Sequence, residues 1–248
     1  MHIFSELYRW LTDATHWHGP KGVPVRILEH LEYSGAAVGL ALLLAIPVAL
    51  YVGHTRRGEF LAVSIANLGR AIPSFAILSI VFQLMLVYFK QKAFGFYPTV
   101  IALFLLAIPP ILTNTYVGIE NVDRDVVEAA RGQGMTEAQI LRRLEIPLAM
   151  PLIAAGVRIA TLQVIATATL AALIAGGGLG VFIVEGFAQG QSGQPMVVAG
   201  AVLVALLAIM TEVVLGGVER AVRPRTASKG ISEVEKPAPA EPVMIGQR

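Results

Sequence analysis

The reactive side chains of this chain do not form a pattern typical of an enzyme. Cysteine is absent, which excludes disulfides, thiolate metal sites and cysteine nucleophiles. The sequence contains neither a GxxxxGK[ST] motif, which would cradle a nucleotide phosphate, nor an HExxH motif, which would bind zinc. Its five histidines lie near the ends of the chain or of its apolar segments. We therefore predict no catalytic residue, no metal site and no bound cofactor in this chain.

One charged segment, residues 120–147, separates two long apolar segments and offers a different chemistry. A bare connection between helices usually needs only about 2–8 residues. Most polar loops are simple connections, but long loops with helices of their own are more often functional. The segment therefore predicts a docking element for a cytoplasmic partner protein.

Within this segment the sequence predicts two short helices joined at a corner. Gly132 and Gly134 allow the sharp turn, because glycine adopts positive φ without a steric penalty. Thr136 and Gln139 have the spacing of a capping box, which would start the second helix. Pro147 is expected to end that helix, because proline has no N–H to donate.

Polar side chains inside the apolar segments are costly in a bilayer, so they are candidates for a translocation path. The alternative for Asn, Gln and Thr is hydrogen bonding between neighbouring helices, which is the more common role. The path candidates are Asn67, Gln83, Asn114, Gln163, Thr167 and Thr169.

A cluster of glycines, Gly176, Gly177, Gly178 and Gly180, would interrupt a helix. Each glycine costs about 1 kcal/mol relative to alanine in a helix interior. A break at membrane depth is tolerated only where protein or water covers it. The cluster is either a hinge or gate, or the outer end of a span with close backbone packing, and the sequence leaves both open.

Five apolar segments must position these residues. Of the 248 residues, 55% are hydrophobic and only 15% are charged, whereas a soluble domain carries about 25% charged residues. A spanning helix needs roughly 20 apolar residues. We therefore predict an all-α, polytopic integral membrane protein. The expected spans cover about residues 34–53, 71–89, 98–119 and 195–217, and the fourth span in chain order lies within the uncharged stretch 159–184. The second helix is expected to extend back toward Phe60 and the fourth toward Pro151.

The expected organisation has three parts. Residues 1–33 form an N-terminal extracytoplasmic or interfacial segment, in which Trp10 and Trp17 favour the membrane surface over a simple soluble tail. Residues 34–218 form the transmembrane domain. Residues 219–248 carry several prolines and mixed charge, which predicts a disordered tail. Lys and Arg are concentrated in the first loop, in residues 120–147 and after the fifth span, which places these regions and the C-terminus in the cytoplasm and the N-terminus outside.

The charged segment resembles the EAA signature of binding-protein-dependent ABC importer permeases. That signature reads EAA, three residues, Gly, nine residues, then Ile-x-Leu-Pro. This chain departs from it by two volume-conserving apolar exchanges, Leu144 for Ile and Ile146 for Leu. The matching positions are Glu128, Ala129, Ala130, Gly134, Leu144, Ile146 and Pro147.

Three further stretches resemble the osmoprotectant branch of this family, whose members carry glycine betaine, choline or carnitine. They are AIPSFAIL at residues 71–78, PPILTNTYVGIENVD at residues 109–123 and TATLAALIAGGGLG at residues 167–180. The resemblance covers about residues 34–217. It implies the type I ABC importer permease fold, in a multi-pass protein of the bacterial cytoplasmic (inner) membrane.

The resemblance also implies partners. They are an ATPase subunit that carries ATP and Mg, an extracytoplasmic substrate-binding protein, and a second permease subunit that is either an identical copy or a paralogue. Glu128 would form an ion pair with the ATPase, Ala129 and Ala130 would pack closely, Gly134 would form the corner, and Pro147 would lead into the fourth span. The net charge of +2 gives no reason to expect nucleic acid.

Other functions remain open from the sequence. The same machinery could import amino acids or another small cation or zwitterion. An ion-coupled secondary transporter would need intramembrane carboxylates, and Glu212 is the one candidate. An intramembrane enzyme would need a convergent nucleophile and base, or a metal set, and no such set is visible.

Overall fold

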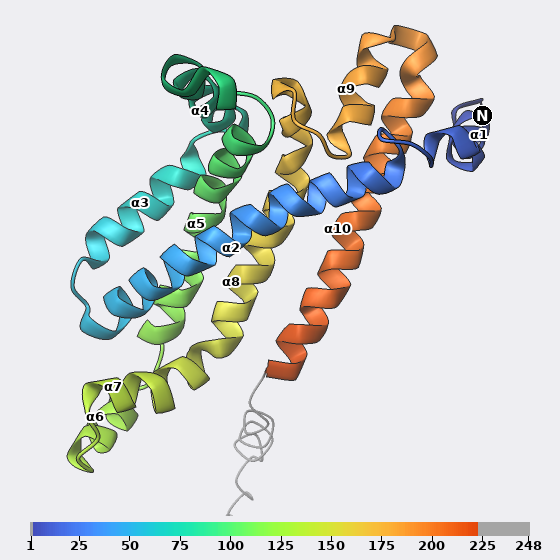
Figure 1. Ribbon diagram of the computed structural model, residues 1–248. Coiled ribbons are helices and arrows are strands. Elements are labelled where there is room, and N and C mark those ends of the chain that lie inside the picture. The colour runs from blue at the N-terminus through green and yellow to red at the C-terminus, as the bar shows by residue number, and fades with distance from the viewer. Residues whose placement is uncertain (1, 223–248) are drawn as a thin grey trace, which may run out of the picture.

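A computed structural model describes residues 2–222 as a bundle of helices (Figure 1). Every regular element in this part of the chain is helical, which confirms the expected all-α class. The α-helices are α1 (His2–Thr12), α2 (Val23–Thr55), α3 (Glu59–Ala71), α4 (Ser74–Phe89), α5 (Phe96–Glu120), α6 (Arg124–Gly132), α7 (Glu137–Ile140), α8 (Ile146–Thr167), α9 (Gly180–Ala188) and α10 (Gln194–Val222).

Five of the described helical stretches are long and apolar enough to cross a membrane, as predicted. They run over Val23–Thr55, Ser74–Lys92, Phe96–Glu120, Glu137–Ile174 and Gly190–Ala221. The third and fifth agree closely with the expected segments, whereas the first, second and fourth differ in extent.

The first spanning helix, α2, begins at Val23, eleven residues before the boundary expected at residue 34. Proline occupies the first turn of α2, where its missing N–H has no helical partner to lose and its fixed φ suits the helix. The polar first turns remain helical because they pack: Val23 and His30 are fully buried. Residues 23–33 are therefore a continuation of the first spanning helix.

The second apolar stretch is divided into two helices. Ile72 is extended, with φ −80° and ψ 125°, and Pro73 follows it directly. Proline disfavours helical backbone in the residue before it, so α3 ends at Ala71 and α4 starts at Ser74. The helix that begins near Phe60 is therefore α3, separate from the span α4.

The fourth helix differs most from the prediction, because Pro147 does not end a helix. α7 continues through a π-helical turn, Leu141–Glu145, directly into α8. In this turn the Ile146 N–H donates to the Leu141 carbonyl, five residues back. Proline is tolerated near the start of α8 because the widened turn already departs from the regular α-helical pattern of hydrogen bonds.

The end of the fourth span falls inside the uncharged stretch 159–184 that was expected to contain it. The helix becomes a tighter 3₁₀ stretch at Ala168–Ile174 and stops there. Val184, the last residue of that uncharged stretch, lies in α9, a separate short helix after the glycines. The interruption follows from Ala175 in left-handed backbone, with φ 56°, and from the glycines after it.

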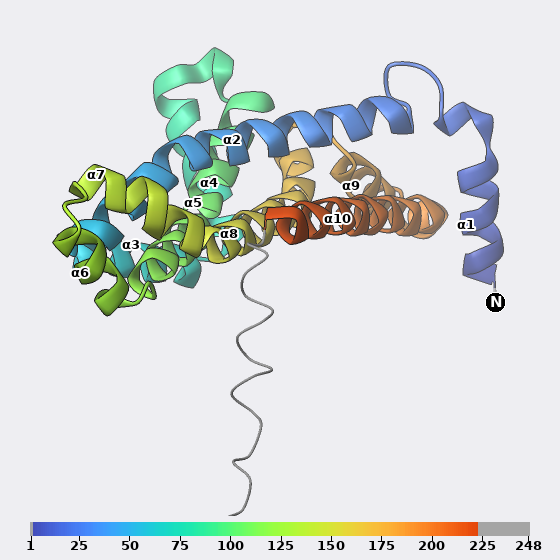
Figure 2. The same ribbon diagram turned by 90° about the horizontal axis from the view of Figure 1, so that it is seen from below.

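The core forms where α2 and α8 pack against α5 (Figures 1 and 2). Small residues allow the close approach. A Cβ added to Gly53 of α2 would lie 2.8 Å from the Ile119 Cβ of α5, and one added to Gly156 of α8 would lie 2.6 Å from the Asn114 Cβ. Small residues at an interface let helices approach closely, and such close packing drives their association in a bilayer, where the lipid is as apolar as the helix surface.

The end of α10 corrects one further boundary. Residues 219–222 form its last helical turn, although they were expected within a disordered tail. The remaining residues of that expected tail, 223–248, lie outside the described part of the chain, and the prediction for them stays open.

We predict that Gly156→Ala destabilises the folded bundle. The added methyl group would press against Asn114, and overpacking of a closely packed site typically costs about 1–3 kcal/mol. Gly39→Ala is the matched control, because Gly39 lies in the middle of α2 with open space around its Cβ position. Thermal unfolding of the purified protein in detergent should give a lower Tm for Gly156→Ala and an unchanged or higher Tm for Gly39→Ala. Equal Tm values would contradict this account of the α5–α8 packing.

Candidate functional site

The charged segment forms a distinct unit at one end of the bundle. α6 and α7 lie beside the α2–α3 turn, and the C-terminal end of α10 points the same way (Figure 1). α1 lies at the far end of α2 in both views (Figures 1 and 2). The first loop, residues 120–147 and Arg220 near the end of α10 therefore lie toward one end of the described part of the chain, which is the arrangement that a common side of the membrane requires.

The backbone of this unit is fixed by local interactions. Asp123 caps α6, since its side chain accepts from the Asp125 N–H at 2.9 Å. Gly134 has φ 82° and forms the corner, whereas Gly132 remains in the last turn of α6. The capping box at Thr136 and Gln139 is present, with the Thr136 N–H donating to Gln139 Oε1 at 2.9 Å. The two helices therefore form a short rigid element.

The side chains of the EAA positions divide into outward and inward groups. Glu128, Ala129 and Gly134 are exposed, so another protein could reach them. Ala130 is buried in its own chain, with 9% exposure, so it packs inward. We had expected it to pack against a partner; helical spacing turns it toward the bundle instead. Of the later positions, Pro147 is exposed, and Leu144 and Ile146 are half-buried.

A network of charged side chains ties this unit to the end of α2. His54 Nδ1 lies 2.6 Å from Glu145 Oε2 in the π-helical turn, and His54 Nε2 lies 3.4 Å from Glu137 Oε2 in α7. Glu137 also accepts two hydrogen bonds from Arg131 of α6, at 2.7 and 3.0 Å. These bonds, with the negative charge of the carboxylate, raise the pKa of Arg131 above its ordinary value. Arg56 pairs with Glu120 at the end of α5.

Sequence reasoning missed this network. His54 and Glu145 are 91 positions apart, and histidine near the end of a span has many ordinary roles. Glu145 is an x position of the signature, yet it is buried with 6% exposure. A buried carboxylate requires a partner, and the sequence alone does not name it.

A cavity of about 280 Å³ lies between the end of α2 and α6. Arg56, Arg124 and Arg131 line it, together with Glu128. Glu128 is thus an exposed carboxylate among the residues that line a mainly basic hollow. Nothing in this arrangement brings together the nucleophile and base that catalysis would need.

The path candidates are not gathered at one place. Three form hydrogen bonds within their own helices: Asn114 donates to the Pro110 carbonyl, Thr167 to Gln163 and Thr169 to Ala166. The acceptor of each bond lies three or four residues back in the chain and not on a neighbouring helix, so these bonds are not the interhelical hydrogen bonds of the alternative interpretation. Asn67, Gln83 and Gln163 lie exposed on α3, α4 and α8.

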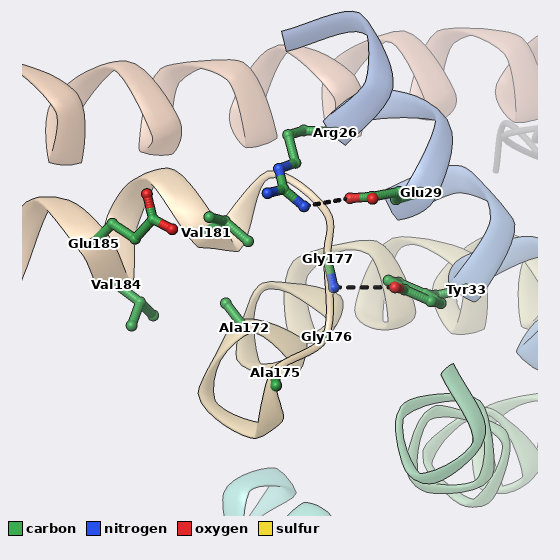
Figure 3. A pocket seen from close by; sticks show the side chains of 10 residues that line it. All are labelled: Arg26, Glu29, Tyr33, Ala172, Ala175, Gly176, Gly177, Val181, Val184 and Glu185. Carbon is green, nitrogen blue, oxygen red and sulfur yellow. Dashed lines mark hydrogen bonds and ion pairs between the residues drawn. The ribbon is translucent and has the colours of Figure 1, made fainter. Parts of the chain in front are cut away.

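Side chains of α2 hold the glycine cluster by accepting hydrogen bonds from consecutive backbone N–H groups. The Gly177 N–H donates to the Tyr33 hydroxyl at 3.0 Å (Figure 3). The Gly178 N–H donates to Glu29 Oε2 at 2.7 Å. The Leu179 N–H donates to His30 Nδ1 at 3.3 Å. We name this contact of Glu29, His30 and Tyr33 with residues 177–179 the α2 clamp.

The α2 clamp explains why the segment is rich in glycine. A Cβ at Gly177 would overlap the Glu29 carboxylate, and one at Gly180 would overlap the Thr169 carbonyl. Gly178 has φ 80°, which an L-residue adopts only with strain. The observed state is therefore the close-packed C-terminal end of the fourth span, while the role as a hinge or gate stays a prediction.

Glu212 also has a partner that the sequence did not identify. Arg158 of α8 donates to Glu212 at 2.8 Å and to Glu219 at 2.9 Å, both on α10. The charges are therefore paired between α8 and α10, as charged groups within a spanning bundle usually are. This pairing gives Glu212 a structural role in holding α10 to the bundle.

Comparison with known proteins identifies relatives of the whole membrane region. The family model described as "Binding-protein-dependent transport system inner membrane component" matches residues 39–224. The glycine betaine/carnitine/choline transport system permease protein OpuCB of Bacillus subtilis (strain 168) is 38% identical over 206 residues, covering 83% of this chain and 90% of that relative. The osmoprotectant import permease protein OsmW of Salmonella typhimurium is 34% identical over 199 residues, covering 79% and 90%.

A solved structure shows the same fold. The inward-facing MetNI methionine ABC transporter contains a chain that superimposes with a TM-score of 0.70 at 22% identity, covering 82% of this chain and 96% of that chain. The helical arrangement is therefore that of an ABC importer permease.

We predict that Thr136→Ala loosens α7. Loss of the capping hydroxyl typically costs about 1 kcal/mol, which should speed amide hydrogen exchange of Gln139 about fivefold. Thr136→Ser keeps the capping oxygen and is the control that should exchange as the original does. Hydrogen exchange of the full chain in nanodiscs, read by mass spectrometry, measures the effect. Equal exchange in all three proteins would show that the capping box does not stabilise α7.

Proposed function

Because the chain belongs to the family of binding-protein-dependent transport system inner membrane components, we propose that it is the membrane-spanning subunit of an ATP-driven importer for quaternary ammonium osmoprotectants. Glycine betaine, choline and carnitine are the expected substrates. The observation that carries this proposal is the similarity to permeases named for these compounds, which extends over about four-fifths of the chain.

The importer obtains its energy from a separate ATPase subunit, which holds the ATP and Mg. The exposed Glu128, Ala129 and Gly134 on α6 and its corner form the docking surface for that subunit. α7 supports this role because it continues without a break into the spanning helix α8. A force on α6 and α7 is thereby transmitted into the membrane by continuous helix rather than by a flexible linker.

The translocation path lies between this chain and a second permease subunit, either an identical copy or a paralogue. The exposure of Asn67, Gln83 and Gln163 in the single chain supports this arrangement. An amide side chain that faces lipid is costly, so these groups are better placed against another subunit or a polar path.

The unit of α6 and α7 faces the cytoplasm, and the opposite end, with α1 and α9, receives substrate from an extracytoplasmic binding protein. The arginines of the α2–α3 turn and of residues 120–147 support this orientation. The N-terminus then lies outside the cell and the C-terminus in the cytoplasm.

Reversal of charge at Glu128 should detach or uncouple the ATPase. Removing one partner of an interfacial charge pair typically costs about 2–5 kcal/mol, so Glu128→Lys should reduce the ATPase recovered with the purified permease at least tenfold. Gln133→Lys is the control, because Gln133 is also exposed in this unit and the variant introduces a lysine without removing a carboxylate. Normal complex formation and transport by Glu128→Lys would contradict the docking assignment.

The substrate class is tested by uptake in proteoliposomes that contain the permease, its ATPase and its binding protein. Unlabelled glycine betaine, choline and carnitine should each compete with labelled choline, because all three carry the same quaternary ammonium group. Methionine and histidine, which lack it, should compete at least about tenfold less well. Uptake of the amino acids without uptake of the quaternary compounds would replace this proposal with amino-acid import.

A further inference from the structure

Another cavity lies at the end of the bundle opposite the α6–α7 unit, between the first turns of α2, the 3₁₀ stretch and α9 (Figure 3). Its volume is about 340 Å³, within the range of about 300–1,000 Å³ that small-molecule sites occupy. We call it the α9 cavity. Its lining combines charged, aromatic and apolar side chains, among them Arg26, Glu29, Tyr33, Val181, Val184 and Glu185.

The carboxylate of Glu185 is the free negative charge of the α9 cavity. Glu185 is exposed on α9, and its side chain makes no ion pair or hydrogen bond within residues 2–222. The other carboxylate of the lining, Glu29, is already engaged, since its Oε2 accepts from Arg26 Nη1 at 2.8 Å and from the Gly178 N–H at 2.7 Å. A cation that enters the cavity is therefore attracted mainly by Glu185.

Arg26 supplies hydrogen-bond donors to the same cavity. Its side chain is 13% exposed, and its Nη1 donates to Glu29, which offsets its positive charge. Its Nε and Nη2 make no hydrogen bond within the described residues, and Nε is buried, so Nη2 is the donor that a ligand can reach. A guanidinium binds a carboxylate by charge-assisted hydrogen bonds, which are stronger than bonds between neutral groups. The cavity thus offers a place for an anionic group beside a place for a cationic one.

The apolar part of the lining favours a methylated cation over a primary ammonium ion. Val181 and Val184 of α9 and Ala172 of the 3₁₀ stretch line the cavity. A primary ammonium ion is strongly hydrated and carries three N–H donors that need acceptors. A trimethylammonium group has no N–H and presents methyl groups, whose contact with valine and alanine removes apolar surface from water.

We propose that the α9 cavity binds a small zwitterion that carries a quaternary ammonium group and a carboxylate, as glycine betaine and carnitine do. Glu185 attracts the ammonium group, Val181 and Val184 contact its methyl groups, and Arg26 Nη2 donates to the carboxylate. Choline has the ammonium group but no carboxylate, so it binds without the contribution of Arg26. The proposal rests on the proposed function and deepens it, because it gives the permease itself a site for part of that substrate class.

Direct binding to the purified full chain tests the site without the ATPase or the binding protein. Saturation-transfer NMR of the chain in nanodiscs detects the methyl protons of glycine betaine, carnitine and choline, and a titration gives the Kd of each. Glu185→Gln should weaken all three about fivefold, near the upper limit for an exposed charge pair. Glu32→Gln is the matched control, because Glu32 is exposed on α2, does not line the cavity and loses the same charge.

Arg26→Gln separates the two charges of the ligand. It should weaken glycine betaine and carnitine about tenfold and should not weaken choline, because choline has no carboxylate to lose a bond. In the original chain glycine betaine should bind about tenfold more tightly than choline for the same reason. Equal Kd values for these two compounds would overturn the proposal without requiring any variant to fold. So would unchanged binding in Glu185→Gln.

Uptake separates failure of the site from failure of the proposed function. If the complete importer in proteoliposomes carries glycine betaine but the chain alone does not bind it, the α9 cavity is rejected as its site and the proposed function stands. If the importer carries none of the three compounds, the proposed function fails. Binding of glycine betaine that depends on Glu185 and Arg26 would then still support a zwitterion site in the α9 cavity.

Discussion

A bilayer leaves no water to satisfy a backbone N–H or C=O, so every departure from regular helix must be compensated by the protein itself. The α2 clamp is the clearest case. In the glycine-rich turn at the end of the fourth span, consecutive backbone N–H groups have no helical partner, and the side chains of Glu29, His30 and Tyr33 accept hydrogen bonds from them. His30 carries a second constraint, because its Nε2 donates to the Ile165 carbonyl of α8 at 2.9 Å. One face of α2 thus fixes both the turn and the helix that precedes it.

The same helix reaches the opposite end of the molecule. α2 contacts the glycine turn through its first turns and the α6–α7 unit through His54 in its last turn. Between these points it packs closely on α5, where Gly53 meets Ile119. α2 is therefore a rigid connection between the two ends of the bundle, and α8 is a second connection because it continues from α7. Motion of the α6–α7 unit cannot occur without a change in at least one of these contacts.

The sequence was informative wherever the cause of a structure is local. The lengths of the apolar segments identified five spans, because a helix needs roughly 20 apolar residues to cross a bilayer. The capping box and the glycine corner at Gly134 followed from side chains within a few residues of each other. The spacing of the EAA positions was likewise a local signal, and the family model matches across that region. Local rules failed at Pro147, where a widened turn absorbed the proline that was expected to end a helix.

Composition, apolar length and short motifs thus determined the helical membrane fold, the place of the charged unit and the family resemblance. Tertiary structure alone decided the partners: His54 with Glu145, Arg158 with Glu212, and three side chains of α2 with the glycine turn. Those pairs lie 54 to 149 positions apart in the chain. A buried charge or a buried backbone N–H requires a hydrogen-bond partner. Which residue becomes that partner depends on how the helices pack, and the packing is a property of the whole bundle rather than of any one segment.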